Sequence, residues 1–241
     1  EAVRARIELL RREGVPNYFG EQRFGRDGAN VAQARAMFAG DEQVRETASG
    51  TGLLSERTSE VSRASVTSRG PRLGPVGDRH LHGLYLSAAR SFLFNEVLAA
   101  RVRAGNWCEI LPGEACMLAG TRSYFIAEQP DDELWQRLAA HDIHPSGPLW
   151  GQGELPCRAT VLALEQQVAA HHPQLARGLE AAGLRQERRA LRVIPEAIEA
   201  EALEHDAWRL RFCLPAGCYA TVVVRELADY RAAGAGPEEN E

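Results

Sequence analysis

The most constraining feature of this sequence is the twelve-residue stretch GVPNYFGEQRFG, which runs from Gly14 to Gly25. Its glycines allow backbone angles that other residues avoid, and its proline fixes one φ angle, so the stretch predicts an ordered loop. Aromatic rings alternate here with Asn17, Gln22 and Arg23, whose side chains can hydrogen-bond to base edges or phosphates. Two interpretations follow: a structural loop anchored by aromatic packing, or a loop that contacts a nucleic acid.

This loop motif closely resembles the signature of the TruD family of tRNA pseudouridine synthases. Four later segments resemble the same family, in the same order along the chain: LSAARSFLFN (86–95), GEACMLAG (113–120), GPLWG (147–151) and LPAGCYATVVVREL (214–227). The matching segments cover nearly the whole chain, except the stretch from about 41 to 81. Several collinear matches are far more specific than one glycine-rich motif.

The resemblance implies an α+β fold: a helix-rich, TruD-type insertion domain with short strands, plus a C-terminal strand–helix piece of the pseudouridine synthase catalytic domain. Residues 1–13 would be a helix that ends the N-terminal part of the catalytic domain. Residues 14–193 would form the insertion domain, 194–230 would return into the catalytic domain, and 231–241 would be a disordered tail. Within the insertion domain, 41–83 is predicted to be a flexible insertion, because it is rich in Ser, Thr, Gly and Arg.

The family's nucleophilic aspartate lies N-terminal to the loop motif, in a sequence resembling GxKDxxAVT. Only thirteen residues precede Gly14 and none of them matches, so the chain is expected to be a C-terminal portion that is inactive alone. Asp78, in Gly-Asp-Arg-His, superficially resembles the missing motif. It lacks the preceding Lys and the following Ala-Val-Thr, and is not expected to be the nucleophile.

One substrate contact is carried over by the resemblance. In the family, an aromatic residue in the LPAGxF/YAT motif stacks on the target uracil, and Tyr219 occupies this position. The local sequence leaves two interpretations open. Tyr219 follows a Pro-Ala-Gly turn, where its ring can face a cleft. Alternatively, it is a core tyrosine whose hydroxyl is satisfied by a hydrogen bond.

Five further residues are candidates for contacting RNA or ordering the active cleft: Asn17, Gln22, Arg23, Phe24 and Arg90. We expect Asn17 to hold the loop through side-chain-to-backbone hydrogen bonds. Packing is the alternative role for Phe24, and a structural ion pair is the alternative for Arg90.

Composition narrows the class of protein. The chain has 241 residues, of which 44% are hydrophobic, enough to bury a core. It contains no signal peptide and no apolar run of membrane-spanning length, so a cytoplasmic protein without a membrane partner is expected. Five cysteines without a C-x-x-C pair, and histidines without nearby ligands at suitable spacing, argue against a metal. The resemblance implies no cofactor.

The net charge of −5 does not by itself suggest RNA, but all 28 basic residues are arginine. Arginine suits bidentate phosphate contacts and stacking on bases. Codon bias in a GC-rich genome is the alternative explanation.

Periodicity and capping signals predict a series of helices and strands. These are a short helix at 30–38, a helix from Ser87 to Arg103, hairpin strands within 107–127, a helix from 131 or 132 through 138, a helical pair at 159–170 and 173–182, and a half-buried strand at 208–214.

Two hypotheses about function remain. The first is a tRNA pseudouridine synthase, an isomerase acting on uridine-13, to which this chain contributes RNA binding and the stacking aromatic; the complete enzyme would be monomeric. The second is a non-catalytic RNA-binding module. Both make tRNA the expected partner, and an unrelated α+β domain is the third alternative.

Overall fold

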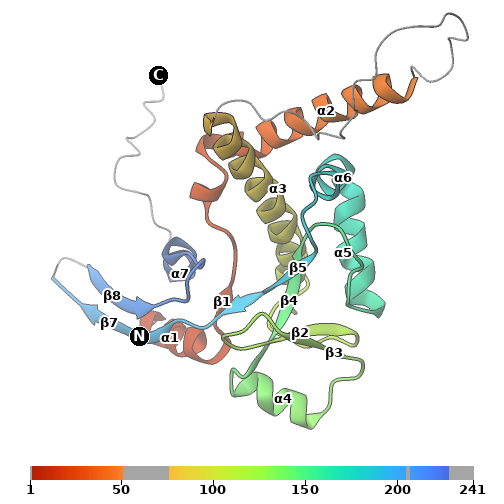
Figure 1. Cartoon of the computed structure of the whole chain (residues 1–241). Coiled ribbons are helices and arrows are strands. Elements are labelled where there is room, and N and C mark those ends of the chain that lie inside the picture. The colour runs from red at the N-terminus through yellow and green to blue at the C-terminus, as the bar shows by residue number, and fades with distance from the viewer. Residues whose placement is uncertain (1, 51–75, 205–206, 228–241) are drawn as a thin grey trace, which may run out of the picture.

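The structure is a computed structural model that describes residues 2–50, 76–204 and 207–227 (Figure 1). The elements in chain order are α1 (Ala2–Glu13), β1 (Val15–Pro16), the 3₁₀ turns η1 (Glu21–Arg23) and η2 (Arg26–Gly28), α2 (Ala29–Gly50), α3 (Val76–Arg103), β2 (Glu114–Leu118), β3 (Tyr124–Ala127), α4 (Asp132–Ala139), β4 (Ile143–Leu149), α5 (Ala159–His171), α6 (Pro173–Ala181), β5 (Glu187–Ala190), β6 (Arg192–Val193), β7 (Glu196–Ala202), β8 (Trp208–Cys213) and α7 (Ala220–Arg225). This mixture of helices and antiparallel strands confirms the predicted α+β class.

The middle of the chain combines a helical layer with an antiparallel sheet of order β3-β2-β4-β5. Helix α3 is the centre of this region, because it packs against α2, α5, α6 and β4 (Figure 1). Phe38, Leu93 and Leu179 belong to the core cluster between these helices. Helix α6 approaches α2 closely: a Cβ added at Gly178 would lie 2.2 Å from Cγ of Phe38, so only glycine fits there.

The two ends of the described chain share a second core. Helix α1, strands β7 and β8, and α7 lie together at one side of the molecule in Figure 1. Ile7, Val193 and Val223 belong to one buried cluster there, although they come from distant parts of the sequence. The short pair β1–β6 connects this terminal region to the sheet, with Val15 opposite Val193. Gly14 permits the connection, since it has φ of +80° and a Cβ would lie 2.6 Å from the Val193 carbonyl oxygen.

Several local predictions are confirmed. Strands β2 and β3 form the predicted hairpin. Asp131 caps α4 by accepting a hydrogen bond from the Leu134 backbone N–H at 2.9 Å. The helical pair is α5 and α6, with Pro173 in the first turn of α6 and Gly183 in the left-handed region just after it. Strand β8 matches the predicted half-buried strand.

The prediction of an irregular segment from 41 to 83 is wrong at both ends. Helix α2 continues to Gly50, well beyond the predicted end at 38, and α3 begins at Val76 rather than at Ser87. The middle of that segment, and the predicted disordered tail at 231–241, lie outside the described residues. Polar composition had suggested a loop, but Ala, Glu, Gln and Arg are good helix formers.

Among the strands that were not predicted, two consist of residues that favour other structures. Strand β7 has the sequence EAIEAEA, rich in helix formers, yet it pairs antiparallel with β8. Strand β4 contains two prolines and a glycine, which are uncommon inside strands, yet it is central in the sheet. Pairing with neighbouring strands therefore overrides local propensity in both cases.

No helix in the described ranges combines the length and apolar character that crossing a membrane requires. The five cysteines are free thiols. Within the described part of the chain there is no group of three His, Cys, Asp or Glu side chains positioned to hold a metal ion.

Candidate nucleic-acid interface

The Gly14–Gly25 loop is attached to the end of the sheet by Asn17. The backbone N–H of Asn17 donates to the Leu191 carbonyl at 2.8 Å, and its side-chain amide donates to the Ala190 carbonyl at 2.9 Å. Asn17 is 5% exposed. The expectation that its side chain holds the loop through backbone bonds is confirmed, although the bonded carbonyls lie far away in sequence.

Phe19 is the central ring of the loop. Its backbone is held on both sides by Asn95 of α3, which accepts from the Phe19 N–H at 2.9 Å and donates to the Phe19 carbonyl at 3.0 Å. The ring packs edge-on against Phe94, with centroids 5.5 Å apart, and against Tyr219, with centroids 6.1 Å apart. The two asparagine bonds fix the ring where the loop, α3 and the C-terminal turn meet.

Tyr219 and Arg23 are brought into contact although 196 positions separate them. The hydroxyl of Tyr219 accepts a hydrogen bond from Nε of Arg23 at 3.0 Å, and Nη1 of Arg23 donates to the hydroxyl of Ser87 at 3.0 Å. The Tyr219 ring also lies close to Gly20, where an added Cβ would be 2.8 Å from Cδ1 of the tyrosine. Tyr219 is half-buried: it packs against the cluster that contains Ile7 and Val223 and stays partly accessible to solvent.

A second arginine, Arg189 of β5, stacks on the central ring. Its guanidinium carbon lies 4.1 Å from the Phe19 centroid. Nη2 donates to Oδ1 of Asn17 at 2.6 Å and to the Gly217 carbonyl at 3.0 Å, which ties β5 to the turn before Tyr219. Burial lowers the pKa of Arg189, and the nearby positive charge of Arg23 lowers it further. Arginine remains charged at neutral pH nonetheless.

We call these five residues the arginine–aromatic cluster: Asn17, Phe19, Arg23, Arg189 and Tyr219. Neither guanidinium has a carboxylate partner among the residues that the structure describes. Two half-buried cations beside aromatic faces leave a local excess of positive charge, although the net charge of the chain is −5. Such an arrangement attracts an anion and offers rings for stacking, which are the properties of a site for a nucleotide.

The remaining predicted residues lie outside this cluster. Arg90 is engaged within the protein: it donates to the carbonyls of Trp150, Leu149 and Arg185 and pairs with Glu187 at 3.1 Å. Arg90 therefore joins α3 to β4 and β5, and its pair with Glu187 matches the alternative of a structural ion pair. Phe24 packs against the helical core, which matches its packing alternative. Gln22 is exposed at the rim of a separate cavity of about 870 Å³, near Phe24 and Phe92.

Sequence reasoning missed Arg189. Residues 187–190 read ERRA, and a strand places alternate residues on opposite faces, but the letters do not show which arginine faces the loop. Asn95 and Ser87 lie in the LSAARSFLFN motif, so that motif marked the segment without marking these roles.

Comparison with known proteins gives a consistent result. The family model "tRNA pseudouridine synthase D (TruD)" matches residues 76–227. The tRNA pseudouridine synthase D of Xanthomonas campestris pv. campestris (strain B100) is 47% identical over 234 residues, which cover 95% of this chain and 57% of that protein. The tRNA pseudouridine synthase D of Nitrosococcus oceani is 42% identical over 228 residues, covering 94% of this chain and 55% of that protein.

A solved structure supports the fold. The chain resembles a protein of Methanosarcina mazei assigned as tRNA pseudouridine synthase D, with a TM-score of 0.59 and 19% identity, over 92% of this chain and 62% of that one. The chain thus spans less than two thirds of the length of the relatives it matches.

Proposed function

The chain belongs to the tRNA pseudouridine synthase D (TruD) family, and from this premise we propose that the protein converts uridine-13 of tRNA to pseudouridine. The observation that carries the proposal is the arginine–aromatic cluster, which combines a half-buried tyrosine ring with two guanidinium groups that have no carboxylate partner among the described residues. The proposed substrate is both aromatic and anionic, so its chemistry matches what the cluster offers.

The proposed reaction is an isomerisation. The bond between N1 of uracil and C1′ of ribose breaks, the base turns, and a bond forms between C5 and C1′. The proton on C5 is lost, and N1 gains one. A carboxylate serves as the covalent catalyst in this scheme. Within the described ranges the contacts of the cluster include no carboxylate, so we propose that the aspartate comes from outside this cluster.

Each member of the cluster has a proposed role. The Tyr219 ring stacks on the target uracil, and Arg23 orients that ring through its bond to the hydroxyl. Arg189 neutralises a backbone phosphate while it fixes the turn before Tyr219 through Gly217. Asn17 and Phe19 are positioning residues that hold the arginines in place.

We further propose a division of the chain that follows its two cores. Residues 14–193 would form the family's insertion domain, while 1–13 and 194–230 would belong to the catalytic domain. The packing of Ile7, Ile198 and Val223 in one cluster supports this grouping, and Val15 and Val193 join that cluster at the boundary. A cytoplasmic location and a monomeric complete enzyme belong to the same proposal.

Substitutions at Tyr219 test the stacking role. Tyr219→Ala should lower the rate or the tRNA affinity of the complete protein by about one to two orders of magnitude, because stacking contributes about 1–3 kcal/mol per base. Tyr219→Phe should lose less than tenfold, because it keeps the ring and removes one hydrogen bond of about 1 kcal/mol. Pseudouridine mapping on an unmodified tRNA transcript, together with thermal melts, measures both effects. A large drop in melting temperature for Tyr219→Ala with unchanged turnover would make Tyr219 a packing residue instead.

A non-catalytic RNA-binding module is the second candidate, favoured because no carboxylate contacts the cluster within the described part of the chain. The 241-residue chain alone should bind a tRNA transcript and form no pseudouridine. Turnover by this chain would contradict the prediction that it is inactive alone. If the complete protein also binds tRNA without turnover, the binding-module function is supported.

A further inference from the structure

A cleft of about 780 Å³ adjoins the arginine–aromatic cluster, because Asn17 and Arg189 line it. Its lining also includes residues of the 215–218 turn, of strand β5 and of the β2–β3 hairpin. The volume is within the range of roughly 300–1,000 Å³ that small-molecule sites occupy. The Tyr219 ring is not part of this lining, so the cleft offers space beyond the place proposed for the target base.

The hairpin that lines the cleft carries a solvent-exposed aromatic ring. Tyr124 opens β3 and is 44% exposed, although large aromatic side chains are usually buried. Tyr124 and Met117 of β2 both line the cleft, and they are paired across the two strands. This pairing fixes the position of the Tyr124 backbone. An accessible ring face in a cleft is the feature on which an unpaired base stacks.

The same hairpin carries a cation that has no partner among the described residues. Arg122 lines the same cleft, is exposed, and has no hydrogen bond or ion pair with any residue in the described ranges. The tip that carries it is ordered: the Ser123 N–H donates to Oγ1 of Thr121 at 3.1 Å, and that hydroxyl donates to the Leu118 carbonyl at 3.1 Å. The hairpin therefore carries an exposed guanidinium two residues before the exposed ring, and both residues line the cleft.

The wall of the cleft carries several polar groups, including the carboxylates of Glu187, which pairs with Arg90, and Glu196. Among them are one donor and one acceptor that a base can use. Nδ1 of His144 accepts a hydrogen bond from Nε of Arg192 at 3.0 Å, so a neutral His144 ring carries its proton on Nε2. Burial and the adjacent Arg192 lower the pKa of His144 to about 4, which keeps the ring neutral at physiological pH. Oε1 of Gln186 is buried and has no hydrogen-bond partner among the described residues. An acceptor left in this state is unfavourable until a donor reaches it.

We propose that this cleft binds a second, unpaired nucleotide of the RNA, distinct from the target uridine, with its base stacked on Tyr124 and its phosphate paired with Arg122. Gln186 and His144 provide an acceptor and a donor for the polar edge of that base or its ribose. The cleft adjoins Arg189, so one strand of RNA can pass from the arginine–aromatic cluster into it. The inference rests on the proposed function, because it takes RNA as the ligand.

Binding of an unmodified tRNA transcript by the complete protein tests the inference. Tyr124→Leu, which removes the ring and keeps an apolar side chain, should weaken binding by about 5- to 150-fold, whereas Tyr124→Phe should bind within about threefold of the wild type. Trp135→Leu is the matched control, since Trp135 is 40% exposed on α4 and does not line the cleft. The same melting temperature in all variants would exclude unfolding as the cause.

The phosphate contact has its own measurement. Arg122→Met should lower the magnitude of the slope of log affinity against log salt concentration by about 0.7, the value for one phosphate contact on a single strand. Arg4→Met, a change at an exposed arginine of α1, should leave the slope unchanged.

The two proposals fail in different ways. If the wild-type protein does not bind the transcript, the proposed function is wrong and this inference falls with it. If the wild type binds and Tyr124→Leu behaves like Trp135→Leu, the second nucleotide site alone is refuted. If Tyr124→Leu weakens binding while Arg122→Met keeps the full salt slope, the stacking contact is supported and the phosphate contact is refuted.

Discussion

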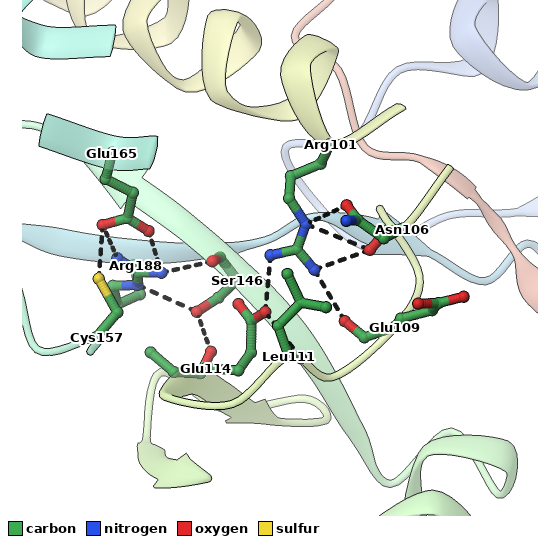
Figure 2. A network of polar contacts seen from close by, with 10 residues as sticks. Arg101, Asn106, Glu109, Leu111, Glu114, Ser146, Cys157, Glu165 and Arg188 are labelled. Carbon is green, nitrogen blue, oxygen red and sulfur yellow. Dashed lines mark hydrogen bonds and ion pairs between the residues drawn. The ribbon is translucent and has the colours of Figure 1, made fainter. Parts of the chain in front are cut away.

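Arg188 and Arg189 are neighbours in β5, and they illustrate two different uses of arginine in this molecule. Arg188 is buried with Glu165: its guanidinium pairs with both carboxylate oxygens, at 2.9 and 2.8 Å, and also donates to Ser146 (Figure 2). Arg189 stacks on Phe19 and pairs with no carboxylate in the described part of the chain. Alternation along the strand separates the two side chains, and their partners give them different roles.

The buried side of this comparison includes a second ion pair. Arg101 and Glu114 are 2% and 0% exposed and 2.7 Å apart, and Arg101 is further bonded to Asn106 and Glu109 (Figure 2). Burial raises the pKa of Glu114, while Arg101 partly offsets that rise. Burial alone would lower the pKa of Arg188, but Glu165 raises it above its ordinary value. In the two buried pairs a carboxylate compensates the charge of each arginine. In the arginine–aromatic cluster the arginine charges remain available to a ligand.

Removing the carboxylate of the buried pair should have the largest effect. Glu165→Ala leaves Arg188 buried without its counter-charge, so the free energy of unfolding should fall by about 3–5 kcal/mol. Urea denaturation measures this, with Glu201→Ala as the control, because Glu201 pairs with Arg209 on the surface and its loss should cost less than about 1 kcal/mol. Equal effects of the two changes would remove the distinction between buried and exposed pairs.

On the other side of β5, Arg189→Met should affect RNA more than stability. The change keeps an apolar stem against Phe19 and removes the charge, so tRNA affinity should fall by about 10- to 100-fold, as expected for a hydrogen bond to a charged group. Filter binding at fixed salt measures the loss, and Arg211→Met on the exposed face of β8 is the control. If Arg189→Met instead destabilises the fold as much as Glu165→Ala does, the two arginines have the same structural role.

The smallest effect concerns pH and a third arginine of this region, Arg192. Its partner His144 has a folded-state pKa of about 4, below the ordinary 6.5, because of burial and the adjacent charge. Between these values the unfolded chain binds a proton that the folded protein does not, so stability falls as the pH decreases from 6.5 towards 4. His144 should account for about 2 kcal/mol of this fall in the free energy of unfolding, a figure that is discounted for the partial exposure of its ring.

A His144→Asn variant should therefore show a shallower loss of stability over this pH range than the wild type. Thermal melts at half-unit pH steps measure the slope, and His80→Asn, a change at an exposed residue of α3, is the control. The same slope in wild type and His144→Asn would mean that His144 does not bind its proton more weakly in the folded state.

Local sequence determined a good part of this structure. Turn residues, caps and alternation within a few positions define the hairpin, the Asp131-capped helix, the α5–α6 pair and strand β8. The sequence alone therefore predicts these elements. The family resemblance was also a property of the sequence, since its motifs are contiguous; the family model confirms it. The roles that the resemblance implies for single residues, such as Tyr219, remain predictions.

Tertiary structure alone decided how the residues of the site combine. Arg23 meets Tyr219 across 196 positions and Arg189 meets Asn17 across 172, and no local pattern encodes such contacts. Strand β7 became a strand because β8 lies beside it, against the helix propensity of its own Glu and Ala residues. Whether an arginine is compensated by a carboxylate or left available for a ligand depends on the face of the strand and the elements packed against it. These long-range contacts form only when the chain has folded.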